Sequence, residues 1–241
     1  MPGPMVLIGG EGFTPEFTPA LRQLRELAGG DAARVVVLPT ATAEDGEGVP
    51  EQRTRLALDY FGKIEARAEA AMVLDKAAAD DPQMAQKVAS ATWIHVSGGK
   101  PVVLRSILED SAVWEAVLAA HGAGALLSGS SAGAIIFGEY GFSPRLPFPP
   151  RLEDLEFDPL PGFKLLPGVA VGPHFDAAPP EITTQLMGML PPGATMVGID
   201  EKTGLLGQDG TWEVVGAGRV TLIRGEARTE YPSGTTVPLF D

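Results

Sequence analysis

Residues 124–137 read GALLSGSSAGAIIF, and their order of apolar and small residues is the most informative about the class of fold. A short apolar run over 124–127 predicts a buried strand, and the apolar run over 134–137 predicts a helix. Between the two runs, Gly129-x-Ser131-x-Gly133 supplies the small residues that a sharp turn from strand to helix requires. The stretch is therefore predicted to be a strand–turn–helix unit of an α/β protein.

The chain upstream repeats this order of strand, loop and helix. Apolar runs predict buried strands over 5–8, 34–38, 64–70 and 93–96. Helical spacing of apolar residues predicts helices over 15–28, 52–61, 81–90, 102–108 and 112–121. Strands that alternate with helices favour a mainly parallel central sheet with helices on both faces, and such sheets bind ligands at the carboxyl ends of their strands.

The C-terminal part of the chain predicts shorter strands, over 169–171, 196–199, 204–206, 212–215 and 219–223. The last three suggest an antiparallel hairpin addition, with turns at Asp209-Gly210 and Ala217-Gly218. The sequence contains neither an internal repeat nor a recognisable domain boundary. We therefore expect one domain over residues 1–241.

Residues 141–162 (GFSPRLPFPPRLEDLEFDPLPG) differ from their surroundings because they contain six prolines. The prolines predict an irregular loop, whereas Phe142, Phe148 and Phe157 favour burial. One interpretation is a surface excursion held by aromatic contacts. The others are a wall or lid over an active site, since the loop leaves the helix that follows Ser131, and a contact within a homodimer.

Composition excludes several classes of protein. The chain has 241 residues, of which 44% are apolar and 20% charged, as in ordinary globular proteins. Its net charge of −13 argues against a nucleic-acid partner. The N-terminal residues do not resemble a signal peptide, and no apolar run is long enough to predict a membrane span. The absence of cysteine excludes disulfides and thiol chemistry, so we expect a cytoplasmic protein.

Ser131 is the candidate nucleophile, because the turn would hold its hydroxyl above the edge of the sheet. The N–H of Ala132 would follow it at a helix N-terminus and could donate to a developing oxyanion. A second donor could come from Gly99 in the loop 97–99, where two glycines leave the backbone unshielded. The alternative is a plain tight turn with an N-capping serine.

A serine nucleophile needs a base, and the sequence contains three histidines. His95 lies inside a predicted strand and is interpreted as a core residue, whereas His121 closes a predicted helix, where a cation is favoured by the dipole. His174 follows the apolar run 169–171 and is therefore the candidate base. Its orienting carboxylate could be Asp200, Glu201 or Asp176, and the spacing of the histidines predicts no metal site.

Six motifs, in this order, resemble the peptidase E and cyanophycinase family of serine peptidases. They are MVLIGGEGF, VVVLPTATAED, IHVSGGKPVVLRSIL, GSSAGA, LLPGVAVGPHF and GIDEKTGLL. The resemblance implies a three-layer sandwich like that of class I glutamine amidotransferases, with Ser131 as nucleophile, His174 as base and Glu201 as acid. It also implies hydrolysis of short peptides next to aspartyl residues, without a metal or organic cofactor.

Two segments depart from the family pattern at the positions that would bind the substrate's charge. Lys100-Pro101 follows the Gly-Gly loop, and the segment after His174-Phe175 lacks arginine. Gly98, Lys100 and Arg105 are candidate substrate-binding residues, and Arg151 is a further candidate anchor for a carboxylate. The alternatives to a peptidase are an esterase or amidase with the same three residues, and a binding protein on a retired enzyme fold.

Overall fold

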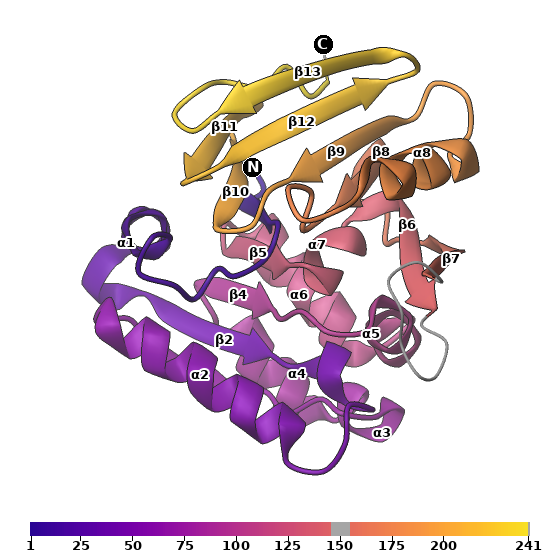
Figure 1. The fold of residues 1–241 in the computed structure, drawn as a ribbon. Helices are drawn as coiled ribbons and strands as arrows, with labels where there is room; N and C mark the ends of the chain where they lie inside the picture. Colours follow the sequence, from indigo (N-terminus) through magenta and orange to yellow (C-terminus); the bar gives the residue numbers. More distant parts are fainter. Residues whose placement is uncertain (146–154, 241) are drawn as a thin grey trace.

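The computed structural model describes residues 1–145 and 155–240, which form two β-sheets with helices packed around them (Figure 1). The first sheet, sheet A, has seven strands, of which β1, β2, β3, β4 and β5 are parallel and β10 and β11 antiparallel to their neighbours. Their order across the sheet is β11 (Thr211–Gly216), β10 (Thr203–Gln208), β1 (Met5–Ile8), β5 (Leu126–Ser130), β4 (Trp93–Val96), β2 (Arg34–Leu38) and β3 (Arg67–Ala70).

The second sheet, sheet B, has six strands and combines parallel and antiparallel pairs. The pairs β6–β8 and β8–β9 are parallel, while the outer pairs are antiparallel. Across the sheet the order is β13 (Ala227–Pro232), β12 (Arg219–Arg224), β9 (Thr195–Ile199), β8 (Leu166–Gly172), β6 (Gly138–Arg145) and β7 (Glu156–Pro161).

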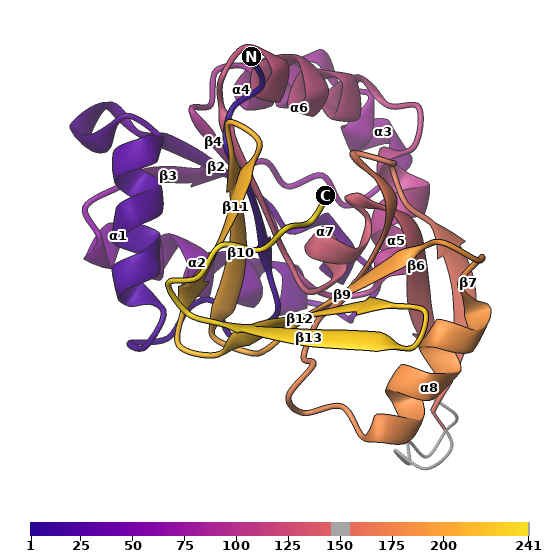
Figure 2. The same ribbon diagram turned by 90° about the horizontal axis from the view of Figure 1, so that it is seen from above.

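Helices cover both faces of sheet A and also pack against sheet B. Figure 2 shows α1 on one side of β10 and β11, and α3, α5 and α6 on the other. Residues of α8 pack against sheet B. The helices are α1 (Thr18–Leu27), α2 (Val49–Lys63), α3 (Lys76–Ala79), α4 (Pro82–Ala89), α5 (Pro101–Leu108), α6 (Ala112–Gly122), α7 (Ala132–Ile135) and α8 (Pro180–Met189).

The alternation of side chains along β1 explains why both faces of sheet A are covered. Val6 and Ile8 join the core under α1 and α2, while Met5 and Leu7 join the core shared with α3–α6 and sheet B. A strand that is apolar on both faces must be buried on both. The predicted α/β sandwich is confirmed, although its strands divide into two sheets.

The C-terminal hairpin is confirmed for β10 and β11. Their turn residues Asp209 and Gly210 have φ of 50° and 81°, as the two-residue turn of a twisted hairpin requires. The predicted turn at Ala217-Gly218 does not form a hairpin, because β12 pairs with β9 and β13 in sheet B. A short antiparallel strand has the same apolar pattern whichever sheet it joins, so the sequence did not reveal this crossover.

Irregular structure throughout 141–162 was the wrong prediction for residues 141–145 and 156–161, which lie in β6 and β7. β7 is at the sheet edge, and β6 pairs with β8 only around Gly138 and Tyr140. Each of these strands therefore has a side without a partner strand. On that side the missing N–H of a proline costs no hydrogen bond between strands. Residues 146–154, including Phe148 and Arg151, lie outside the described residues.

Among residues 1–145 and 155–240, no helix combines the length and the apolar character needed to cross a bilayer.

The core under α1 predicts that shortening a buried leucine lowers the free energy of unfolding more than shortening an exposed one. Leu24 is 0% exposed and Leu56 is 47% exposed. We expect Leu24→Ala to lower the free energy of unfolding by about 2–5 kcal/mol, and Leu56→Ala by much less, because only Leu24 leaves a cavity. Urea titration followed by circular dichroism measures both values. Equal losses in the two variants would contradict the assignment of this core.

Candidate active site

The candidate site lies where the carboxyl ends of strands from the two sheets meet. Gly9-Gly10 follows β1, the loop 97–99 follows β4, and Ser131 follows β5, all in sheet A. His174 follows β8 and Glu201 follows β9, both in sheet B. The backbone joins the sheets here, since the N–H groups of His174 and Lys202 donate to Gly9 and Gly10 at 3.0 and 2.9 Å.

Ser131 occupies a strained turn between β5 and α7, with φ of 50° and ψ of −112°. A non-glycine residue in this region costs about 1–3 kcal/mol and must be held by its surroundings. The backbone N–H of Ser131 donates to the Ile8 carbonyl at 2.9 Å. Gly129 and Gly133 permit the tight packing, because added Cβ atoms would lie 2.5 Å from the Gly133 backbone and 2.3 Å from the Val96 carbonyl oxygen, respectively.

The imidazole of His174 reaches Ser131 directly. Its Nε2 is 3.0 Å from Ser131 Oγ, within hydrogen-bond distance. His174 also has a positive φ, 52°, and its ring packs closely against Gly10. A Cβ at Gly10 would lie 2.4 Å from Cε1 of the ring, so only glycine fits beside this imidazole.

Glu201 completes a line of three hydrogen-bonded side chains. Its Oε1 lies 2.9 Å from Nδ1 of His174. The contact favours the tautomer in which Nδ1–H donates to the carboxylate and Nε2 accepts the hydrogen of the serine hydroxyl. The arrangement has the geometry of a nucleophile, a base and an orienting acid.

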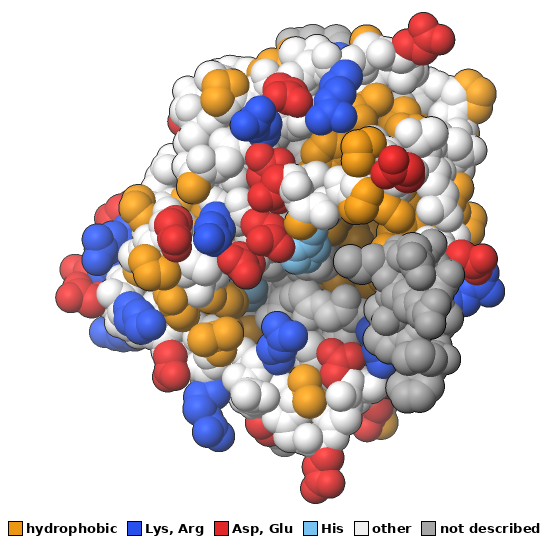
Figure 3. Space-filling model, viewed as in Figure 1, with side chains coloured by type: hydrophobic (Ala, Val, Ile, Leu, Met, Phe, Trp, Pro, Cys, Tyr) orange, Lys and Arg blue, Asp and Glu red, His pale blue; other side chains and the backbone are white. Residues whose placement is uncertain are grey.

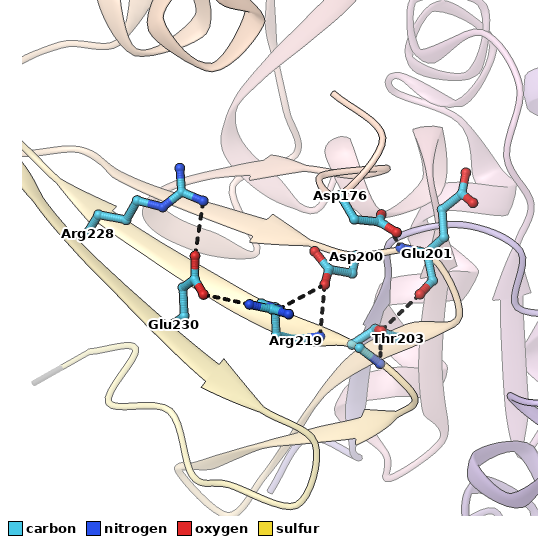
Figure 4. Close-up of polar contacts among 8 residues, drawn as sticks. Asp176, Asp200, Glu201, Thr203, Arg219, Arg228 and Glu230 are labelled. Carbon is cyan, nitrogen blue, oxygen red and sulfur yellow. Dashed lines mark hydrogen bonds and ion pairs between the residues drawn. The ribbon is translucent and has the colours of Figure 1, made fainter. Parts of the chain in front are cut away.

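The two other candidate acids make different contacts (Figure 4). Asp176 accepts a hydrogen bond from the backbone N–H of Glu201 at 2.8 Å, so it holds the main chain that carries the acid. Asp200 accepts from the N–H of Arg219 at 3.1 Å, and burial raises the pKa of this carboxyl. Of the three alternatives, the structure brings only Glu201 to the imidazole.

The candidate oxyanion donors lie beside the serine. Gly98 packs against Ser131, since a Cβ there would be 3.1 Å from the serine Cβ. Gly99 has a φ of 148°, and a Cβ there would lie 2.4 Å from the Ala41 carbonyl oxygen. Within the described residues, no backbone acceptor receives the N–H of Gly99 or Ala132. α7 is only four residues long, so its dipole contributes less than the sequence suggested.

Two of the predicted cationic anchors, Lys100 and Arg105, are held by partners outside the cavity beside Ser131. Lys100 Nζ donates to the Glu44 carbonyl at 2.8 Å and pairs with Asp45 at 3.4 Å. Arg105 pairs with Glu109 at 2.8 Å and donates to the Pro161 carbonyl at 3.2 Å. Neither side chain lines the cavity beside Ser131.

The other two histidines are buried away from Ser131. His95 Nδ1 is 3.0 Å from Ser128 Oγ, and its ring packs against Phe13 and Phe61, as expected for a core residue. His121 bonds to the Ala125 carbonyl, and burial lowers its pKa. His121 lies in the last turn of α6, as the sequence predicts, but its burial disfavours the charged ring that a helix C-terminus would stabilise.

A cavity of about 310 Å³ opens beside Ser131 and His174. Most of its remaining lining is apolar, with Phe142 and Phe157 from the β6–β7 hairpin among the contributors. Figure 3 shows histidine surface in a hollow with apolar surface next to it. Within the described residues, no three His, Asp or Glu side chains are grouped closely enough to hold a metal ion.

Sequence reasoning missed two supporting residues. No role is assigned to Gly10 from the sequence, although the doubled glycine after the first predicted strand is an available signal. Asp176 was considered only as an acid, because its contact with the Glu201 backbone depends on how β8 and β9 lie side by side.

Comparisons with known proteins agree on one family. The family model described as peptidase family S51 matches residues 5–215. A cyanophycinase from Synechococcus elongatus is 30% identical over 247 residues, covering 95% of this chain and 71% of that protein. A cyanophycinase from Geminocystis herdmanii is 26% identical over 235 residues, with coverage of 92% and 81%.

Two solved structures are similar in fold. A peptidase from an acI-B1 actinobacterium superposes with a TM-score of 0.84 at 25% identity, covering 98% of this chain and 97% of that one. A putative peptidase E protein from Listeria monocytogenes has a TM-score of 0.62 at 16% identity, with coverage of 96% and 99%. The second likeness concerns the fold alone.

The packing of the imidazole on Gly10 predicts a specific effect of adding one methyl group. We expect Gly10→Ala to push the ring from Ser131 and to slow labelling of the serine by a fluorophosphonate about 100-fold, since small misplacements at this distance are costly. Gly62→Ala in α2 is the matched control, because a Cβ there meets nothing within 4 Å. Unchanged labelling in Gly10→Ala would show that the contact does not position His174.

Burial of His95 predicts a pH-dependent loss of stability. Burial lowers its pKa from 6.5 to about 4, so the unfolded chain binds this proton at a higher pH than the folded chain does. Stability therefore falls as the pH decreases from 6.5 to about 4, by up to about 3 kcal/mol from this residue. Because glutamine does not titrate, the free energy of unfolding of wild type should approach that of His95→Gln as the pH falls through this range. If the two free energies instead keep a constant difference, the prediction is contradicted.

Proposed function

The chain belongs to peptidase family S51 and is a serine peptidase, and from this premise we propose that it hydrolyses short peptides through an acyl-enzyme on Ser131. In this proposal His174 is the general base and Glu201 is the carboxylate that orients it. The observation that carries the assignment is the hydrogen-bonded line Glu201–His174–Ser131, with contacts of 2.9 and 3.0 Å.

The first half of the reaction forms the acyl-enzyme. The oxygen of Ser131 attacks the scissile carbonyl carbon, and the hydroxyl proton moves to Nε2 of His174. The carboxylate of Glu201 stabilises the imidazolium through Nδ1–H. The carbon–nitrogen bond then breaks as Nε2 delivers its proton to the leaving amine, which departs and leaves the acyl group on Ser131.

The second half restores the enzyme. A water molecule gives a proton to Nε2 of His174 as its oxygen attacks the acyl carbon. The ester bond breaks, and the proton returns to the oxygen of Ser131. In both halves, negative charge develops on the former carbonyl oxygen. The N–H groups of Ala132 and Gly99 are the donors we assign to it, because both are free of backbone partners within the described residues.

A panel of substrates distinguishes the peptidase from an esterase or amidase with the same three residues. Peptide mixtures, aspartyl dipeptides and simple esters are incubated with the purified protein, and the products are identified by liquid chromatography and mass spectrometry. Peptide cleavage that exceeds ester cleavage supports the proposal. Turnover of esters alone would favour the esterase.

The neighbouring serine supplies the control for the nucleophile. We expect Ser131→Ala to lower turnover about 1,000-fold or more without unfolding the protein, because the acyl-enzyme can no longer form. Ser130→Ala should retain activity, since no role in the site is assigned to its side chain. Initial rates and circular dichroism measure the two effects. Undiminished hydrolysis in Ser131→Ala would remove the nucleophile assignment.

A further inference from the structure

The cavity beside Ser131 is continuous with the reaction centre. Ser131, His174 and Gly99 all contribute to its lining. A peptide whose scissile carbonyl lies at Ser131 must therefore place a side chain adjacent to that bond in or against this cavity. The chemistry of the walls then decides which side chain is accepted.

The walls are mostly apolar, and several segments of the chain contribute to them. Phe142 and Phe157 come from the β6–β7 hairpin, Phe175 directly follows His174, and Ile182 and Leu186 come from α8. Phe142 and Leu186 are buried members of the core on sheet B, with Phe175 and Ile182 packed against them. The walls are therefore part of a packed core.

Phe175 ties these walls to the catalytic line. Its N–H donates to the Ile199 carbonyl at 3.1 Å. Its ring covers Gly198, where a Cβ would be 2.5 Å from the ring. Because Phe175 follows His174 directly, the aromatic wall is held in place by the same backbone that places the base.

The described lining holds no cation that could receive a substrate carboxylate. His174 is the sole titratable side chain among the described residues that line the cavity. Lys100 and Arg105 are paired elsewhere. Arg228 lies over the Phe175 ring but lines a separate hollow and pairs with Glu230 at 3.2 Å. Among the described lining residues, an aspartyl side chain in the cavity would find no cation to offset its lost hydration.

We propose, on the basis of the proposed peptidase function, that this cavity is a subsite for an apolar side chain flanking the scissile bond, such as leucine, methionine or phenylalanine. The occupant belongs to the substrate, because the cavity is continuous with Ser131 and His174. At this subsite the described walls then select the substrate side chain by hydrophobic contact.

The experiment compares side chains of nearly equal shape. Peptides carry leucine, asparagine or aspartate on either side of one cleavable bond and alanine elsewhere, and kcat/KM is measured for each. We expect leucine to exceed aspartate about 100-fold or more at the position that enters the cavity, because a carboxylate there is desolvated without a partner. Equal rates for the three, or faster cleavage next to aspartate, would overturn the subsite.

A charge placed on the wall should change this preference. Ile182→Lys introduces a cation into the lining, and we expect the leucine-to-aspartate ratio of kcat/KM to fall about tenfold or more. Gln185→Lys adds the same charge on the exposed surface of α8 and should leave the ratio unchanged. An unchanged ratio in a folded Ile182→Lys variant would contradict the proposal.

Failure of this inference can be distinguished from failure of the peptidase proposal. Fluorophosphonate labelling reports on the Ser131 hydroxyl without using any substrate side chain. If Ser131 is labelled and peptides are cleaved, but the apolar peptides are not preferred, the subsite is wrong and the nucleophile stands. If the protein cleaves peptides equally well after Ser131→Ala, the proposed mechanism itself is wrong.

Discussion

The site depends on one backbone junction between the two sheets. Gly9 accepts the N–H of His174 at 3.0 Å and donates its own N–H to Thr203 at 3.0 Å, while Gly10 accepts the N–H of Lys202 at 2.9 Å. The first bond holds the end of β8 against the end of β1, the third holds the segment after β9 there, and the second joins β1 to β10 within sheet A. Ser131 belongs to sheet A and His174 to sheet B, so this junction fixes the imidazole near the hydroxyl.

The junction also holds strain where the proposed chemistry occurs. Ser131 and His174 both have positive φ, at 50° and 52°, a conformation that side chains rarely adopt. Such residues persist only when their surroundings determine them strongly. Here the surroundings are glycines that bring backbone and rings unusually close, with Gly129 on Gly133 and Gly10 on the imidazole. The position of the base is thus set by packing as well as by hydrogen bonds.

Three carboxylates near the carboxyl end of β9 each have a different hydrogen-bond partner. Glu201 contacts the imidazole, Asp176 holds the Glu201 backbone, and Asp200 holds the backbone of Arg219 at the start of β12 (Figure 4). On the other side of His174 the surroundings change from polar to apolar. The hydrogen-bonded line of Glu201, His174 and Ser131 therefore lies between a charged network and a hydrophobic cavity.

Local features of this protein follow from its residues alone: the parallel strands with apolar residues on both faces, the small-residue turn at Ser131, and His174 as the remaining histidine at a strand end. They depend on composition and short-range periodicity, which act within a few residues. For the carboxylate at the imidazole the residues left three candidates, and only the resemblance to a family favoured Glu201. Local pattern did not reveal the contact of Glu201 with the imidazole, the place of β12 in sheet B, the strands β6 and β7 despite their prolines, or the partners of Lys100 and Arg105 outside the cavity. The reason is that each of these outcomes is a contact between segments distant in the chain, and a strand or a charged side chain carries no local record of the partner it will find.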